Sequence, residues 1–240
     1  MNDKGEFIDP NEFLIFIQVH QIANAAEIMR SYSGWQEADF VKFKAWIADV
    51  FYPHITKFLS THNGNECALH YWLNWDLSAM TALLSIGILA DDNFKINEAI
   101  QYFKFGIGSG NIGNGVPFIH LDLDSNEMLG QCQESGRDQG HATLCVSLLG
   151  AFCQMAKNVG EDLFIFDDGR ALAMCEYVAK YNIGSAETGS SSASWKMTGF
   201  RYTDNDLPYT TYTNCSGSWD TISAQERREG CLLYTSDAAD

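Results

Sequence analysis

The chain has 240 residues, of which 46% are hydrophobic and 13% aromatic, and its formal net charge is −16. This length and apolar content can bury a core, and they exclude an intrinsically disordered chain. The acidic charge argues against a nucleic-acid partner and against an anionic membrane, because neither tolerates such a field without a strong local basic patch. No apolar run approaches the roughly 20 residues that a membrane-spanning helix needs.

Apolar residues at helical spacing predict one helix after another along the chain. The predicted helices cover residues 12–32, 35–59, 74–89, 94–105, 137–159 and 168–181. Pro53 is expected to kink or end the second of them, because proline removes a backbone donor. Residues 106–130 are rich in glycine and are expected to form a loop or a short extended segment. We therefore expect an all-α fold, an incomplete (α/α) toroid of antiparallel helix pairs with long loops, although a generic bundle or solenoid fits the periodicity equally well.

The seven cysteines contain no CxxC pair and no His-Cys ligand spacing. Cys145, Cys153 and Cys175 fall in apolar helical segments, where a free cysteine behaves as a small core residue. We expect free thiols, no metal and no cofactor.

The densest polar cluster is residues 131–141, between the glycine-rich segment and an apolar helix. Its members are Gln131, Cys132, Gln133, Glu134, Ser135, Gly136, Arg137, Asp138, Gln139, Gly140 and His141. Arg137 and His141 are four residues apart and share one helix face. Asp138 is three residues from His141, a spacing that suits fixing the imidazole tautomer. The residues alone fit a helix cap at Ser135 as well as they fit a site, and a zinc site of Glu134, Asp138 and His141 has thin support.

A second candidate is Asn74-Trp75-Asp76, which follows Tyr71 and Trp72 at the head of another apolar helix. A flat aromatic face beside amide and carboxylate groups is what a sugar subsite needs. The alternative is that Asn74 only caps its helix, since asparagine is a favoured cap, while the two tryptophans fill the core.

A third polar group lies in residues 160–182, where structural ion pairing is the expected role. Its carboxylates are too close together in sequence to flank a sugar in the way that glycoside hydrolysis requires. They are Glu161, Asp162, Asp167 and Asp168, with Arg170 and Glu176 nearby.

Three segments in this order resemble the bacterial alginate lyase family, whose members form (α/α) toroids, and are most similar to the polysaccharide lyase 38 group. They are Asn74-Trp75-Asp76-Leu77, the run from Gln131 to His141, and Gly160-x-Asp162-Leu163 followed by Arg170, Glu176-Tyr177 and Lys180-Tyr181-Asn182. The upstream segment 20–28 fits as well, so the similarity extends from about residue 20 to residue 182.

The resemblance implies β-elimination on a uronate polysaccharide of the alginate or glucuronan type. Such an enzyme removes the C5 proton beside the sugar carboxylate, whose charge must first be neutralised by hydrogen-bond donors. In this interpretation Asn74, across the cleft from the run 131–141, is the neutralising donor, and His141 is the base or a second stabilising group. The remaining implied residues position the substrate: Trp75, Gln131, Glu134 and Arg137.

In the family pattern a later segment, Arg-Pro-x-Trp-Glu with a nearby tyrosine, supplies an arginine and the catalytic tyrosine. Residues 222–230 look like the approach to it, and residues 231–240 then match a translated sequencing adapter. We expect a partial lyase domain in residues 1–230, an artefact in 231–240, and a chain that is inactive or severely impaired as written. The first residues lack the features of a signal peptide, but Met1 is expected to be an internal methionine of a periplasmic or secreted parent.

Two other functions remain open at this point. An (α/α)-barrel glycoside hydrolase would work through two carboxylates and leave no new double bond. A non-catalytic relative would bind oligosaccharides without turnover. Neither the sugar stereochemistry of the polymer nor the oligomeric state is indicated by the sequence.

Overall fold

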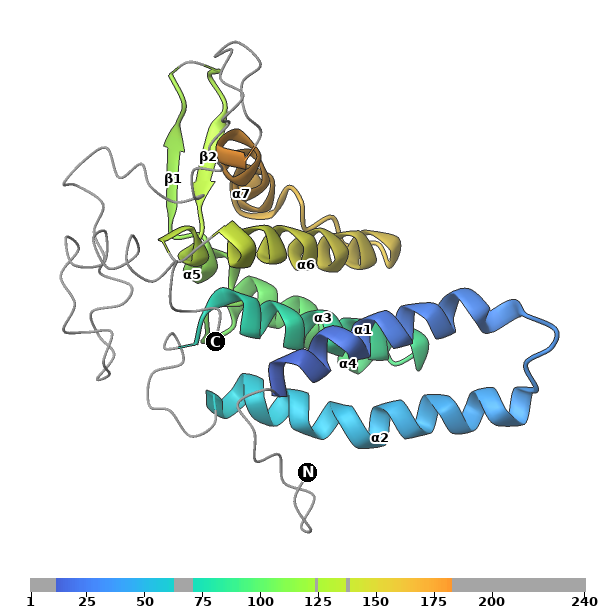
Figure 1. Ribbon diagram of the computed structural model, residues 1–240. Coiled ribbons are helices and arrows are strands. Elements are labelled where there is room, and N and C mark those ends of the chain that lie inside the picture. Colours follow the sequence, from blue (N-terminus) through green and yellow to red (C-terminus); the bar gives the residue numbers. More distant parts are fainter. Residues whose placement is uncertain (1–11, 63–70, 124, 137–138, 183–240) are drawn as a thin grey trace.

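The computed structural model describes residues 12–62, 71–123, 125–136 and 139–182 (Figure 1). Within these residues the fold is mostly helical and toroid-like, as predicted. The larger helices are α1 (Glu12–Ile28), α2 (Glu37–Thr61), α3 (Leu73–Leu89), α4 (Asn93–Phe105), α6 (Gln139–Asn158) and α7 (Phe166–Asn182). The short elements are the 3-10 helices η1 (Met29–Ser31) and η4 (Gln133–Gly136), the one-turn helix α5 (Ile112–Gly115), and the strands β1 (Phe118–Leu121) and β2 (Met128–Gln131). The part of the chain that is described contains no helix suited by length and apolarity to crossing a membrane.

Helix α3 is the centre of the core. It is buried around almost its whole circumference, and it contacts α1, α2, α4 and α6. A helix that is apolar on all sides must be covered on all sides, and Figure 1 shows α3 and α4 between α2 and α6. Stacked rings of Phe103 on α4 and Phe152 on α6, with centroids 5.3 Å apart, close this core. Each such buried ring contributes about 1.5–3 kcal/mol.

Pro53 does not end the second predicted helix, because α2 continues to Thr61. That part of the prediction is wrong. Proline at this position leaves the carbonyl of Asp49 without its helical donor. Both residues are exposed, so water can satisfy that carbonyl. The proline is therefore tolerated on the solvent side of the helix.

The glycine-rich segment 106–130 forms the loop and extended structure that the sequence predicts, with α5 as an additional helical turn. Strands β1 and β2 pair antiparallel, with Phe118 opposite Gln131, and β2 packs against α7. A Cβ on Gly130 would lie 2.8 Å from the backbone nitrogen of Met174, so only glycine allows this close approach.

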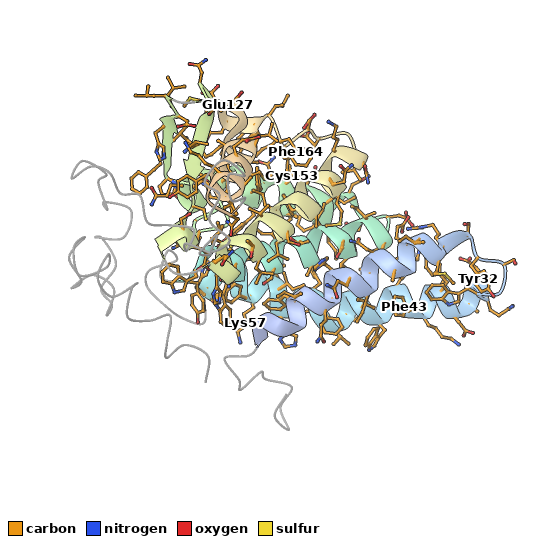
Figure 2. All side chains as sticks on the ribbon, turned by 45° about the horizontal axis from the view of Figure 1, so that its top comes forward. Tyr32, Phe43, Lys57, Glu127, Cys153 and Phe164 are labelled. Carbon is orange, nitrogen blue, oxygen red and sulfur yellow. The ribbon has the colours of Figure 1, made fainter. Side chains whose placement is uncertain are left out.

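The start of α3 and the turn between α1 and α2 lie at opposite ends of the helical layer (Figure 1). Tyr32, at the turn between α1 and α2, lies at the end of the molecule opposite to Lys57 near the C-terminal end of α2 (Figure 2). The N-terminal end of α3 meets the C-terminal end of α2 through a contact between His62 and Asp76. Asn74 and Asp76, at the start of α3, therefore lie at the end away from Tyr32.

Candidate active site

The site is built from three segments: the start of α3, the glycine loop (residues 106–111), and the end of β2 with η4. The residue that caps α3 is Trp72, and its side chain makes no capping hydrogen bond. Asn74 lies inside the first turn, so the interpretation of Asn74 as a mere helix cap is wrong. The interpretation that Trp72 and Trp75 fill the core is only partly right, since both residues are half-buried.

Asn74 and Glu134, which are 60 residues apart in sequence, meet at the start of α3. The backbone N–H of Asn74 donates to Glu134 Oε1 at 3.4 Å. The first N–H groups of a helix have no partner within the helix, and Glu134 supplies one from another element. Both residues are buried, with exposed fractions of 1% for Asn74 and 0% for Glu134.

A second link joins the same segments through the backbone of Tyr71. Its carbonyl oxygen accepts hydrogen bonds from Ser109 Oγ at 2.8 Å and from Gln133 Nε2 at 3.5 Å. The glycine loop, the start of α3 and η4 are therefore held around one carbonyl. Within the third segment, Cys132 Sγ lies 3.2 Å from Ser135 Oγ.

Among the buried amide oxygens of these segments, Oδ1 of Asn74 and Oε1 of Gln131 have no hydrogen-bond partner within the described residues. Asn74 and Gln131 are each 1% exposed. A buried polar atom left unsatisfied is uncommon in folded proteins and calls for a ligand, a water or another explanation. The oxygen and nitrogen of an amide are interchangeable by rotation, so each group can present a donor or an acceptor to a ligand.

Of the other predicted site residues, His141 lies in the first turn of α6 and is half-buried. The start of α6 is tied to the end of α7 by a 2.6 Å bond from Gln139 Nε2 to Asn182 Oδ1. Arg137 and Asp138 lie outside the described residues. The shared face of Arg137 and His141, and the zinc site that includes Asp138, therefore stay predictions.

The carboxylates of residues 160–182 lie mainly in ion pairs, as expected. Lys104 Nζ binds Glu161 at 2.9 Å, and Lys157 Nζ binds Asp162 at 2.9 Å. The Lys157 partner holds the pKa of Asp162 below its ordinary value. Arg170 pairs with Asp167 and also donates to the Val116 carbonyl at 2.7 Å. These pairs contribute to the packing of α7 and of the loop before it.

The sequence did not indicate the role of the buried group that we call the Asp76 cluster: His62, Asp76, Tyr102 and the N–H of Gly110. Nε2 of His62 lies 2.9 Å from Asp76 Oδ1. Asp76 Oδ2 accepts from the Tyr102 hydroxyl at 2.9 Å and from the Gly110 N–H at 2.9 Å. Burial and the adjacent carboxylate raise the pKa of Tyr102 far above its ordinary value, so the hydroxyl remains a donor. A carboxylate inside an otherwise apolar helix was the available signal, because such a group needs buried partners.

The family model for alginate lyase matches residues 3–188 of the chain. The chain therefore belongs to the alginate lyase family, a family of polysaccharide lyases whose substrates are acidic polysaccharides. No curated protein and no solved structure matches it.

Proposed function

We propose that this chain binds a uronate-containing polysaccharide of the alginate or glucuronan type at the N-terminal end of α3 and cleaves it by β-elimination. The observation that carries the proposal is that Asn74 and Gln131 are buried amides with unsatisfied oxygens, on segments that the Asn74–Glu134 and Tyr71–Gln133 bonds join. The half-buried rings of Tyr71 and Trp75 lie just before and within the first turn of α3. Amides that can donate or accept, next to aromatic surface, suit a sugar ring with its hydroxyls and carboxylate.

The chemical demand of β-elimination explains why an amide is needed. The C5 proton is too weakly acidic to be removed until the neighbouring carboxylate has been neutralised, and donors must stabilise the charge that develops there. Asn74 meets this demand when its NH₂ group is turned toward the substrate. The positive end of α3 points the same way, because Asn74 lies in its first turn.

The other predicted residues take supporting roles. Glu134 Oε1 accepts a hydrogen bond from the Asn74 backbone N–H, so its role is to hold Asn74 in place. His141 serves as the base or as a second group on the carboxylate, and Gln131 and Arg137 position the substrate. No described residue is assigned the role of the catalytic tyrosine. A periplasmic or secreted location suits a substrate of this kind.

The test is a digest of polymannuronate, polyguluronate and glucuronan, followed by ultraviolet absorbance of the unsaturated product. It is run on the chain as printed and on a form in which a relative's C-terminal segment replaces residues 231–240. In the form with the relative's segment, Asn74→Ala is expected to abolish the signal, whereas Ser85→Ala should leave it unchanged. Ser85 is buried on the same helix, and within the described residues its hydroxyl donates to the Ala82 carbonyl alone, at 2.8 Å.

Two outcomes would replace this proposal by an alternative. Saturated products, lost on changing acidic residues but retained in Asn74→Ala, would identify a glycoside hydrolase. Measurable oligosaccharide affinity with no turnover in either form would identify a non-catalytic binding relative.

A further inference from the structure

The Asp76 cluster joins four segments of the chain at one buried point. His62 ends α2, Asp76 belongs to the first turn of α3, Tyr102 belongs to α4, and Gly110 belongs to the glycine loop. His62 and Asp76 are buried, with exposed fractions of 1% and 0%, and both oxygens of the carboxylate already have partners within the chain. A buried carboxylate is tolerated only when its oxygens accept several hydrogen bonds, and here they face the imidazole, the hydroxyl and the amide.

The glycine loop is fitted closely onto this carboxylate. A Cβ on Gly108 would lie 2.3 Å from Asp76 Oδ2, and a Cβ on Gly110 would lie 2.3 Å from Met80 Sδ. A side chain at either position would force the loop or the groups it contacts to shift, because both distances are far inside ordinary contact. Asp76 therefore helps to set the position of the loop, together with the bond from the Ser109 hydroxyl to the Tyr71 carbonyl.

The same carboxylate lies next to the proposed site in two ways. It is two residues after Asn74 on the first turn of α3. The loop that it holds also carries Ser109, whose hydroxyl fastens the Tyr71 carbonyl that Gln133 shares. A shift of Asp76 would accordingly move Asn74 and its surroundings together.

We propose that Asp76 is a positioning residue of the uronate site: anchored by His62, Tyr102 and the Gly110 N–H, it fixes the place of Asn74 relative to the glycine loop. This inference rests on the proposed function for its binding readout. It assigns a role to a group that touches no substrate and that the elimination chemistry does not use.

The test compares the full chain with Asp76→Asn, with Ser85→Ala as the matched buried control on α3. Hydrogen exchange of the Gly110 amide is measured first, and Kd values for mannuronate, guluronate and glucuronate oligosaccharides are measured by titration calorimetry. Asp76→Asn keeps the size of the side chain but exchanges one acceptor for a donor. We expect faster exchange in the loop and binding about tenfold weaker, with Ser85→Ala unchanged in both.

The combination with Asn74→Ala separates positioning from a general loss of stability. If Asp76 acts through Asn74, the Asn74→Ala substitution weakens binding much less in the Asp76→Asn background than in the wild type. The inference would be overturned if the fold-losses of affinity in the two single variants multiplied fully in the double variant. An unchanged Kd in Asp76→Asn would overturn it as well. If Asp76→Asn does not fold, Tyr102→Phe removes one donor only and is expected to show the same effects, smaller in size. If the wild type binds none of the oligosaccharides, the proposed function fails, and hydrogen exchange alone tests whether Asp76 anchors the loop. Equal protection of the Gly110 amide in Asp76→Asn and Ser85→Ala refutes this anchoring. Faster exchange in Asp76→Asn alone supports it.

Discussion

The substitution Gly108→Ala tests the close fit of the glycine loop most sharply. The added Cβ would lie 2.3 Å from Asp76 Oδ2 and 2.6 Å from the Tyr102 hydroxyl, whereas ordinary contact begins at 3.4 Å. The loop or the Asp76 cluster must then shift by about 1.1 Å, the difference between 3.4 Å and 2.3 Å. This movement breaks the 2.9 Å bond from the Gly110 N–H to Asp76. Overpacking costs about 1–3 kcal/mol and an unsatisfied buried polar group about 1–3 kcal/mol, so we expect a loss of about 2–6 kcal/mol in the free energy of unfolding.

The assay is urea unfolding followed by circular dichroism, with Gly150→Ala as the matched control. Nothing lies within 4 Å of a Cβ built on Gly150, which is inside α6. Alanine there is expected to raise the free energy of unfolding by about 0.5–1 kcal/mol, because glycine is a poor helix former. A Gly108→Ala chain as stable as the wild type would refute the claim that the carboxylate and the loop are fitted to each other.

Three further predictions concern other buried or half-buried side chains of the described residues. Burial raises the pKa of the Cys132 thiol to about 11 and that of Cys153 to about 12, so both should resist alkylation at pH 8 in the native chain and react once urea unfolds it, as mapped by mass spectrometry. Burial raises the pKa of Tyr52 to about 12, and the neutral hydroxyl is thus favoured in the folded state. Its contribution to stability is fully present below about pH 10 and is lost as the pH rises through about 12, so Tyr52→Phe should show a flatter loss of stability above pH 10. Glu134→Ala should cost about 1–3 kcal/mol by removing the acceptor at the start of α3, while Glu134→Gln, which keeps an acceptor, should cost less in the same urea titration.

Much of the helical fold could be predicted because it depends on local pattern. The apolar residues of α3 follow one another so densely that only a central helix can bury them. The glycines of residues 106–130 likewise indicate a break in the helices. The passage of α2 through Pro53 could not be foreseen, since it depends on which side of the helix faces solvent. The register that places Phe118 opposite Gln131 depends on packing of β2 against α7, a contact that no local pattern encodes.

The site was only partly predictable from the sequence, for a related reason. Asn74, Gln131 and Glu134 were singled out by motif, and the structure brings Asn74 and Glu134 into contact. The burial of Glu134 could not be predicted, because acidic residues are seldom fully buried. Asp76 was grouped with the sugar subsite, yet it faces inward to the end of α2, and that partner is 14 residues earlier in the chain. The free thiols of the apolar helices, in contrast, are as expected for Cys145, Cys153 and Cys175.

The most direct test of the central claim is the ultraviolet absorbance of polyuronate digests made with the form that carries a relative's C-terminal segment. The account predicts unsaturated uronate ends from the parent and from Ser85→Ala, and none from Asn74→Ala. Unsaturated ends formed equally well by Asn74→Ala, or products with no double bond, would contradict an elimination site at the start of α3.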